Sequence, residues 1–536
     1  MPDLMRWPGT LRGHGPRRTL AVMLVLLCTG CALAPLAPTP ASASADPVAP
    51  EGSAARTCAH WYLRLDEAVV QAEVRDVAAS PVPGHRFLRV DRYHASLRDR
   101  LPDRADAPTA ASVRAALMAR LLELDLQARG HEIANLPQAS RSALADLAQR
   151  PATAAALLQH THACGQVMLQ SALANTARAH ATLRALAVAH DYVAAYRVLG
   201  LYPVTRIPFL YGVRRFEDAT RDTFRQDSPP DAGAPRQLLV PPSRPAPELV
   251  TPEQLRAMLQ PAADDPLGIP APTPAQQEIL FAHFAPSFVL GIRSNDDRAG
   301  ALRWPAQPQS GTPVPDIARP VVYRQLAWTR HGKASLLQLV YTVWFGGRAP
   351  TSWPIDLLAG RLDGLVWRVT LSSDGVALMY DSIHPCGCYH QFFPPPWVRP
   401  RPPPDPHAEW AFSPAPAPRT APGHYLVLGV APVTHYLTRL EARPHADGTP
   451  YAWQDYDHLR SLPTPEGTHR SVFDSRGFIA GTDRAEAWLF WPMGIARAGS
   501  MRQWGRHATA FVGRRHFDDA RLLEERFVLE PPPRDD

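Results

Sequence analysis

Prolines divide this chain into stretches that can and cannot form regular secondary structure. The sequence of 536 residues contains 59 prolines, which are sparse at 57–224 and dense at 225–275 and 394–423. Because proline lacks a backbone N–H and fixes φ, it interrupts helices and the interiors of sheets. We therefore predict an α+β chain, with a helical region at 57–224, a proline-rich connector at 225–275 and a β-rich region at 276–536 that carries an extended loop at 394–423.

Within 57–224 the apolar residues recur at helical spacing, as in SVRAALMARLLELDLQARG, which predicts several packed amphipathic helices. Cys58 and Cys164 both lie here, and in an oxidising compartment they are the natural disulfide pair. Such a bridge closes a loop of about a hundred residues, which in the chain-entropy model stabilises the fold by about 4 to 5 kcal/mol. His160 and His162 lie beside Cys164 but face different directions on a helix, so we interpret them as surface residues.

The β-rich region begins near residue 288, where the pattern changes to that of strands. VVYRQLAWTR and ASLLQLVYTVWF flank a turn at 331–333, and LVWRVTLSS and VALMYDSIH flank a turn at 374–375. These stretches predict two antiparallel hairpins. HYLVLGVAPVTHYLTRL and AEAWLFWPMGI are expected to add strands to the same sheet. Four tryptophans are expected in the core or on the sheet surface: Trp344, Trp367, Trp488 and Trp491.

The first residues have the layout of an export signal. Arg17 and Arg18 precede the apolar run TLAVMLVLL, and the small-residue stretch CTGC follows it. The run is about half as long as the roughly 20 residues that a transmembrane helix requires. The sequence therefore predicts an exported chain that does not span the membrane.

Residues 27–31, LCTGC, resemble the lipobox of bacterial lipoproteins. The resemblance implies that residues 1–31 contain the signal peptide and that Cys31 is diacylated and anchors the protein to a membrane. Ala32 in the next position implies sorting to the outer membrane, and the Ala/Pro-rich residues 32–56 would then be a tether. The alternative is cleavage after the alanines of ALAPLAPTPASASA, without a lipid. Both alternatives place the protein in the cell envelope, facing the periplasm.

The net charge of +6 does not indicate a nucleic-acid partner. All the basic residues except one lysine, Lys333, are arginines. No basic run is interleaved with aromatic residues. Export also separates the protein from intracellular nucleic acid. We therefore predict no nucleic-acid binding.

Residues 384–390, HPCGCYH, concentrate cysteine and histidine at the end of a predicted strand. In a continued strand His384, Cys386, Cys388 and His390 would share one face, about 6.6 Å apart. Both a disulfide and a metal site require a closer approach. Gly387 permits the necessary turn, because glycine adopts positive φ readily.

Three interpretations of this turn remain open. The first is a Cys386–Cys388 disulfide, which the oxidising compartment favours. The second is a zinc or copper site with the two thiolates and His384 or His390 as ligands, completed by a distant residue. The third is thiol catalysis by a cysteine of lowered pKa beside a histidine. The distant ligand would be one of His469, His507 or His516.

Other polar groups are weaker candidates. Asp363 with Asp381 could form a carboxylate pair, although turn and cap roles explain these aspartates and Asp356 more simply. THRSVFDSRG contains the residue types of a hydrolase triad, His469, Ser471, Asp474 and Ser475, but triads are assembled in space rather than in sequence. Basic residues also cluster in the stretch WGRHATAFVGRRHFDD, where they could bind an anion or form a solvated basic face: Arg506, His507, Arg514, Arg515 and His516.

The C-terminal half, from YTVWF through LDGLVWRVTL to YDSIHPCGCYHQFF, resembles exported proteobacterial proteins without an assigned activity. The resemblance implies an envelope protein and no particular reaction. We therefore predict a lipid-anchored envelope protein with a non-enzymatic binding or scaffolding role, no cofactor, and an envelope protein as a possible partner. The alternative is a zinc-, copper- or thiol-dependent protein centred on HPCGCYH.

Overall fold

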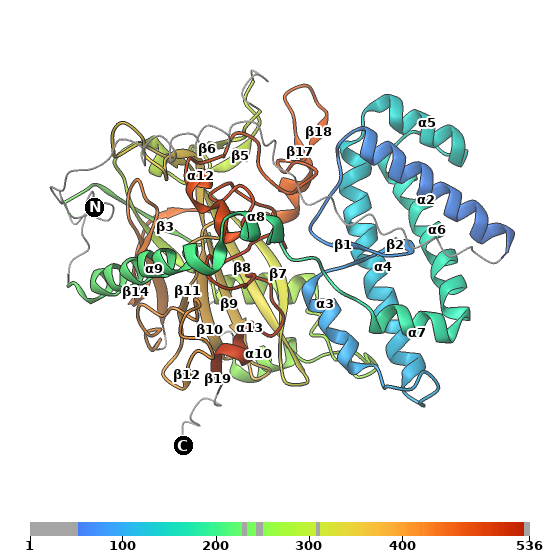
Figure 1. Ribbon diagram of the computed structural model, residues 1–536, viewed down its shortest axis with the longest axis horizontal. Coiled ribbons are helices and arrows are strands. Elements are labelled where there is room, and N and C mark those ends of the chain that lie inside the picture. Colours follow the sequence, from blue (N-terminus) through green and yellow to red (C-terminus); the bar gives the residue numbers. More distant parts are fainter. Residues whose placement is uncertain (1–51, 228–232, 243–249, 307–310, 422, 530–536) are drawn as a thin grey trace, which may run out of the picture.

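The computed structural model of the protein describes residues 52–227, 233–242, 250–306, 311–421 and 423–529 (Figure 1). The predicted signal peptide, the expected lipidation site Cys31 and most of the tether lie outside these residues. The α+β prediction is confirmed, because helices dominate residues 53–225 and mostly antiparallel sheets follow. No helix within the described ranges has the length and hydropathy needed to cross a bilayer.

The helical region is built on two long helices, α4 and α6, which pack against each other and against α2. Its core includes Trp61, Leu121 and Leu157, all of them buried. The first helix begins at Ser53, so the end of the predicted tether is helical, as its alanines favour. The elements are α2 (Ser53–Gln71), β1 (Ser80–Val82), β2 (His85–Val90), α3 (Arg92–Ser96), η3 (Leu97–Arg100), α4 (Ala110–Asn135), α5 (Gln138–Ala148), α6 (Ala154–Ala174), α7 (Thr176–Arg184), α8 (Ala194–Leu199) and α9 (Tyr202–Arg225).

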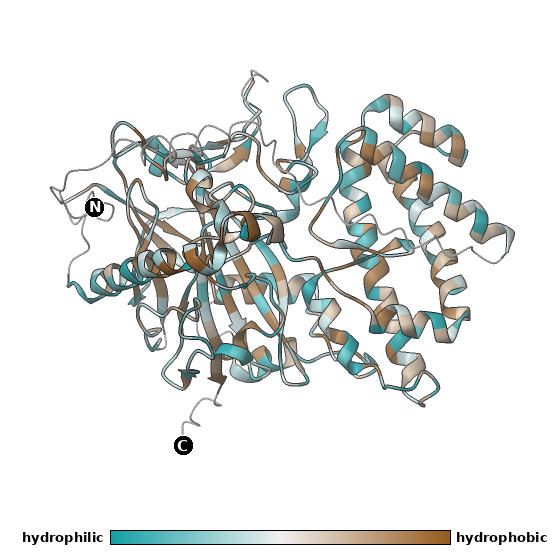
Figure 2. Cartoon of the chain, in the orientation of Figure 1, coloured by the Kyte–Doolittle hydropathy of each residue, from teal (hydrophilic) through white to brown (hydrophobic). Residues whose placement is uncertain are grey.

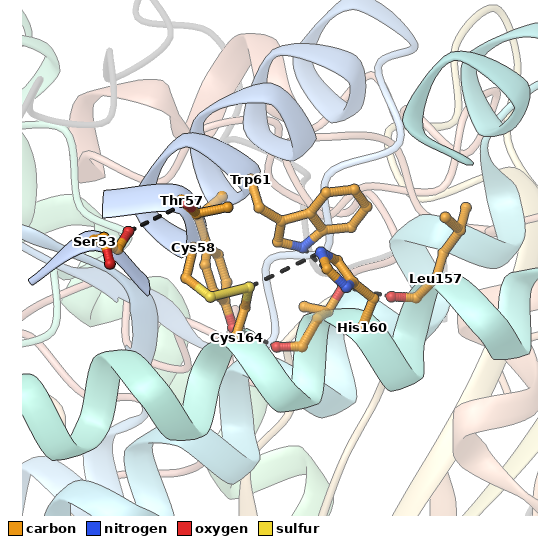
Figure 3. Close-up of a disulfide and its surroundings, with 9 residues drawn as sticks. Ser53, Thr57, Cys58, Trp61, Leu157, His160 and Cys164 are labelled. Carbon is orange, nitrogen blue, oxygen red and sulfur yellow. Dashed lines mark hydrogen bonds between the residues drawn. A yellow bond between two sulfur atoms is a disulfide. The ribbon is translucent and has the colours of Figure 1, made fainter. Parts of the chain in front are cut away.

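A disulfide joins Cys58 of α2 to Cys164 of α6, which confirms the predicted pair (Figure 3). The two Cα atoms are 5.0 Å apart, within the usual range for a disulfide. Beside it, the indole N–H of Trp61 donates to Thr161 at 3.2 Å. The ring of His160 packs edge-on against Trp61, so this histidine belongs to the packing around the bridge.

The β-rich region contains a six-stranded sheet in the order β11-β10-β9-β8-β7-β16. Both predicted hairpins are present: β7 pairs with β8 from His331↔Ala334 onward, and β9 pairs with β10 from Leu371↔Ala377. The strands are β7 (Val321–His331), β8 (Ala334–Arg348), β9 (Gly360–Leu371), β10 (Ala377–Ile383), β11 (Gln391–Phe393) and β16 (Ala452–Asp455).

A second, five-stranded sheet has the order β14-β13-β4-β3-β15. The stretch HYLVLGVAPVTHYLTRL forms strands of this sheet and not of the first, so that part of the prediction is wrong. The connector contributes β3, so it is partly ordered in a sheet. The strands are β3 (Arg236–Val240), β4 (Ser287–Gly291), β13 (His424–Val430), β14 (Leu437–Pro444) and β15 (Thr449–Pro450).

The stretch AEAWLFWPMGI is helical and does not form the predicted strand. It contains α12 (Ala487–Phe490) and η8 (Trp491–Met493). A short apolar run does not distinguish a strand from a helix, and Pro492 cannot donate to a sheet ladder. The remaining elements are α10 (Pro252–Met258), α11 (Pro274–His283), η5 (Asn295–Asp297), β5 (Ala301–Arg303), β6 (Val314–Asp316), β12 (Val398–Pro400), η7 (Tyr456–Ser461), β17 (Leu462–Pro463), β18 (His469–Arg470), α13 (Leu522–Arg526) and β19 (Phe527–Leu529).

Both faces of the six-stranded sheet are buried. One face presents Trp367 and Val369 to a core shared with the five-stranded sheet and with α10 and α11. The other presents Val366 and Ile383 to Phe517 of the C-terminal segment. Side chains on either face of this sheet are therefore removed from solvent, and polar ones require partners.

The helical and β-rich regions meet through buried polar contacts. The Asp76 carboxylate accepts hydrogen bonds from Arg460 Nε at 2.8 Å and Nη2 at 2.9 Å, and from Gln503 at 2.8 Å. Tyr93 donates to Ser335 at 2.7 Å on another part of the contact. These residues are buried. Each region therefore needs the other to satisfy the hydrogen bonds of its buried polar side chains.

Candidate functional site: the HPCGCYH hairpin and its buried network

HPCGCYH is the loop of a hairpin that joins β10 to β11, whose register pairs Ser382 with Gln391. The N–H of His384 donates to the carbonyl of Cys388 at 3.0 Å, and that of Gly387 donates to the carbonyl of His384 at 2.8 Å. Gly387 has φ of 89°. A Cβ at this position would lie 2.5 Å from the Ala508 carbonyl oxygen, so conformation and space both require glycine.

We predict that Gly387→Ala lowers the free energy of unfolding by about 2 kcal/mol or more, because strain at positive φ adds to the clash with Ala508. Gly332→Ala is the matched control: Gly332 has φ of 57° in the β7–β8 turn, and its added Cβ would meet nothing within 4 Å. That variant is expected to lose only about 1 kcal/mol. Denaturant unfolding of both variants measures the difference, and equal losses would contradict the role of close packing at Gly387.

The hairpin register places His384 and His390 on opposite faces of the sheet. Because Ser382 pairs with Gln391, His390 shares the face of Ile383, whereas His384 lies on the face of Ser382. His384 Nδ1 lies 3.0 Å from Asp363, and His390 Nε2 lies 2.9 Å from Asp381. The shared face expected for a continued strand is therefore absent.

On the His384 face, Asp363 binds two imidazoles. Its carboxylate oxygens lie 3.0 Å from His384 Nδ1 and 3.1 Å from His435 Nδ1, and the Arg484 guanidinium is 3.6 Å away. All four residues are buried. His435 Nε2 points in turn to Asp297 at 3.4 Å. The result is a chain of alternating carboxylates and imidazoles, which we call the Asp363 network.

The charges of this network are set by opposing effects. Burial alone would raise the pKa of Asp363, but His384 and Arg484 outweigh it and hold that pKa well below its usual range. Burial would lower the pKa of His435, but the carboxylates of Asp297 and Asp363 on either side of its ring raise it. Burial lowers the pKa of His384 despite the adjacent Asp363. The network therefore stabilises the ionised form of Asp363 and the protonated form of His435, and it disfavours the protonated form of His384.

On the opposite face, Asp381 is held by a guanidinium. Arg368 Nε and Nη2 contact its two carboxylate oxygens at 2.9 and 2.5 Å, and His390 lies beside one of them. The Arg368 guanidinium also lies 3.7 Å from the ring centroid of Phe517. Burial lowers the pKa of His390 to about 3, so its imidazole is neutral. Asp363 and Asp381 do not form the predicted carboxylate pair, because the sheet separates them.

Cys386 and Cys388 are free, buried thiols, so the predicted disulfide between them is not formed. Backbone hydrogen bonds close the turn instead, and the Cys388 N–H lies 3.4 Å from the Cys386 sulfur. The hydrogen bond from Cys386, together with burial, raises the pKa of the Cys388 thiol well above its usual range. In the described part of the chain no hydrogen bond joins either thiol to an imidazole, so the structure does not assemble the predicted thiol–histidine pair.

The proposed metal ligands do not converge. His384 and His390 each face a different carboxylate on opposite sides of the sheet. Across the described residues, no group of three or more His, Cys, Asp or Glu side chains is arranged to hold a metal ion. Of the distant candidates, His469 is exposed in β18. His507 lies beside the turn, because a Cβ on Gly387 would be 3.5 Å from the His507 Cα, but burial lowers the pKa of its imidazole to about 4.

The remaining sequence candidates serve structural contacts. Asp356 accepts from the backbone N–H groups of Thr351 and Leu358, as expected of a turn aspartate. In THRSVFDSRG, Ser471 accepts from Phe473 and Asp474 accepts from Phe478. Each of these bonds closes a local turn, and no hydrogen bond in the described chain links a serine, a histidine and an aspartate of this stretch into a triad.

The predicted basic face at 506–516 is largely buried at the contact between the two regions. Asp191, which precedes α8, lies 2.7 Å from Arg506 and 3.3 Å from His516. Arg515 is buried and donates to Thr509 at 2.9 Å. Arg514 remains at the surface near His190. These residues bind the protein's own carboxylates and carbonyls and leave no anion-binding face of the predicted kind.

Four residues of the Asp363 network lay outside the sequence prediction: Asp297, His435, Arg484 and the adjacent Glu486. Glu486 is buried, and burial raises its pKa to about 7. Arg484 Nε and Nη1 are buried without a hydrogen-bond partner among the described residues. No local motif marks these residues, because Asp297, His435 and the Arg484–Glu486 stretch come from three different segments. His435 adopts a positive φ of 52°. This backbone conformation marks the residue in the structure, but it cannot be read from the amino-acid composition.

No family model matches this chain, and neither a curated protein nor a solved structure matches it significantly. The function must therefore be inferred from the buried polar groups around the HPCGCYH hairpin. Its imidazoles, carboxylates and thiols lie inside the sheet packing and bind one another. Such an arrangement fixes the positions of the two sheets and of the C-terminal segment.

The titration of Glu486 leads to a prediction for Glu486→Gln. The folded-state pKa of about 7 lies above the ordinary 4.5, so this carboxyl favours folding below pH 4.5, and that contribution is lost as the pH rises to 7. The neutral amide removes the loss, and we expect the variant to be more stable than the parent by up to about 3 kcal/mol at pH 8 and equal to it near pH 4. Urea unfolding at both pH values tests this. A variant that is less stable at pH 8 would contradict it.

Proposed function

We propose that this protein is a lipid-anchored protein of the cell envelope with a non-enzymatic binding or scaffolding role. The observation that carries the proposal is the internal pairing of the HPCGCYH hairpin: His384 and His390 each bind a buried carboxylate of the same chain. Polar residues that are fully buried and hydrogen-bonded to one another stabilise the folded structure of the protein. The binding surface is then expected outside this hairpin.

The envelope location is supported by two independent features. The N-terminal residues have the pattern of a signal peptide with a lipobox that ends at Cys31. The Cys58–Cys164 bridge in the helical region is of the kind that persists in oxidising compartments. A tether at 32–52 would leave the folded body beside the membrane to which Cys31 is attached.

The lipid anchor is tested on the full precursor expressed in a bacterial host. The mass of the N-terminal peptide of the mature protein should correspond to a diacylated Cys31, and Cys31→Ala should abolish that mass. A mature N-terminus further along, within 32–45, and without acyl chains would contradict the anchor. Peptide mass is preferred to membrane association here, because a protein can bind membranes without a lipid.

The non-enzymatic assignment is tested by the state of the cysteines. We expect two thiols, Cys386 and Cys388, that react with an alkylating reagent only after unfolding, one disulfide, and no stoichiometric zinc or copper in the purified protein. Cys386→Ser should leave the metal content unchanged. Bound metal that is lost in Cys386→Ser, or rapid alkylation of the native protein, would favour the metal- or thiol-dependent alternative.

A further inference from the structure

The helices that lead from the helical region to the β-rich region expose a large apolar surface. It is formed by α8, the first half of α9, α12 and η8, which lie on the front of the molecule in Figures 1 and 2. Val198 is 73% exposed and Trp488 is 77% exposed. We call this surface the apolar face. It consists of Val198, Leu199, Leu201, Val204, Ile207, Tyr211, Trp488, Leu489 and Trp491.

Packing between these helices makes the apolar face continuous. Trp491 of η8 lies edge-on to Tyr196 of α8, with ring centroids 6.2 Å apart. Phe490 contacts Phe209 of α9 at 5.3 Å. A Cβ on Gly200 would lie 2.5 Å from Pro492, so α8 and η8 are in direct backbone contact. The exposed residues of the four elements therefore form one surface.

The core of the protein does not need these apolar residues. On its inner side α9 already packs Leu210 against Met493 and Val512, and Phe216 against Tyr389. Val204, Ile207 and Tyr211 recur on the outer side at helical spacing. An apolar outer stripe in addition to a complete inner one indicates a surface that is covered by a partner.

The charged residues of α8 and of the first half of α9 are basic, whereas the exposed Asp218 and Asp222 follow in the second half of α9. From Ala194 to Arg215 the charged residues are the arginines at positions 197, 206, 214 and 215, without an aspartate or glutamate. Arg214 and Arg215 are exposed, whereas Arg206 lies 3.8 Å from Asp405. Arg214 also donates to the Pro406 carbonyl at 2.6 Å. Exposed tryptophan and tyrosine beside aliphatic residues, flanked by arginine, are typical of helices that lie at the surface of an anionic membrane.

We propose that the apolar face docks onto an anionic lipid surface, with Trp488, Ile207 and Val198 inserted below the headgroups and Arg214 and Arg215 at the phosphates. The inference rests on the proposed envelope location and names the binding partner. The 21 residues between Cys31 and Ser53 span at most about 70 Å, so an anchor at Cys31 would hold the face at high effective concentration beside the bilayer.

The test uses the full chain carrying Cys31→Ala, so that no acyl chain contributes. The protein is mixed with vesicles of phosphatidylethanolamine and phosphatidylglycerol (3:1), or of phosphatidylcholine, and the bound fraction is measured by flotation. We expect binding to the anionic vesicles that weakens with salt. Ile207→Ser with Trp488→Ser should weaken it at least tenfold. Arg214→Gln with Arg215→Gln should remove the preference for anionic over zwitterionic vesicles.

The matched control removes the same residue types elsewhere. Trp353 is 91% exposed and Ile355 is 60% exposed, and neither belongs to the apolar face. Trp353→Ser with Ile355→Ser should bind vesicles as the parent does. All substituted side chains are exposed, so equal unfolding midpoints are expected and verify that each variant is folded.

Three outcomes would overturn the proposal. One is equal vesicle binding by the face variant and the control variant, and another is no binding by the parent. The third is a concentration-dependent dimer that Ile207→Ser with Trp488→Ser abolishes, because a second copy of the chain would then cover the face. Failure of the lipid anchor appears separately, in the mass of the N-terminal peptide, and leaves the vesicle assay interpretable.

Discussion

Replacing Asp363 with asparagine is expected to lower the free energy of unfolding by about 3 to 5 kcal/mol, because it leaves buried positive groups without their counter-charge. In the parent, one carboxylate accepts from His384 and His435 and lies beside Arg484. The amide can accept at one oxygen only, and it carries no charge to offset the guanidinium. Denaturant unfolding at pH 6 measures the loss.

The pH dependence of the same variant makes the test specific. The lowered pKa of Asp363 means that its contribution is present above the ordinary value of 3.8 and is lost as the pH falls through its folded value. The raised pKa of His435 means that its contribution is complete below 6.5 and is lost as the pH rises through its folded value. The contributions of Asp363 and His435 are therefore both present between about pH 4 and pH 6.5. The lowered pKa of His384 acts in the opposite direction, because its contribution is complete above 6.5 and is lost as the pH falls through its folded value.

Asp363→Asn should flatten this part of the stability profile. Asp356→Asn is the control, because Asp356 only closes a turn at 351–358 and is expected to cost about 1 kcal/mol without a change of profile. An Asp363 variant that loses stability uniformly from pH 4 to pH 8 would show that the paired imidazoles are not the source of its effect.

The second large effect is expected for the disulfide. Cys58→Ala with Cys164→Ala opens a loop with a sequence separation of 106 residues. In the chain-entropy model this costs about 4 to 5 kcal/mol. The measurement is urea unfolding of the parent and the variant, with and without a reductant.

A reductant should bring the unfolding midpoint of the parent to that of the double variant and leave the variant unchanged. Cys386→Ala is the control, because Cys386 is a free thiol and its replacement does not open a covalent loop. If the reductant also lowers the midpoint of the double variant, a second disulfide is present and the assignment of Cys386 and Cys388 as thiols is wrong.

The parts of this fold that the sequence predicts are those determined over short distances. The two hairpins follow from alternation and from turns such as Asp374–Gly375. The capping boxes of Thr251 and Thr273 at the starts of α10 and α11 likewise involve only neighbouring residues. The Cys58–Cys164 pair follows from the position of both cysteines in one predicted helical region. In each case the residues whose interaction determines the local structure lie in the same region of the chain.

The candidate site could not be predicted in the same way. Asp363, His384 and His435 are brought together by the packing of two sheets, and their separations in sequence carry no period. The face of His390 depends on the Ser382↔Gln391 register, and a shift of one residue would reverse it. Sequence reasoning found the polar residues of the hairpin, but their partners are a property of the tertiary fold.

The contact between Asp76 and Arg460 also has a consequence for folding kinetics. The two residues are 384 positions apart in the chain, and the N-terminal part of a polypeptide is synthesised first. Until the segment near Arg460 arrives, the helical region carries an unpaired carboxylate at a position that the native fold buries. The final compaction of the helical region is therefore expected to wait for the last fifth of the polypeptide, and during that interval the chain is open to chaperones and proteases.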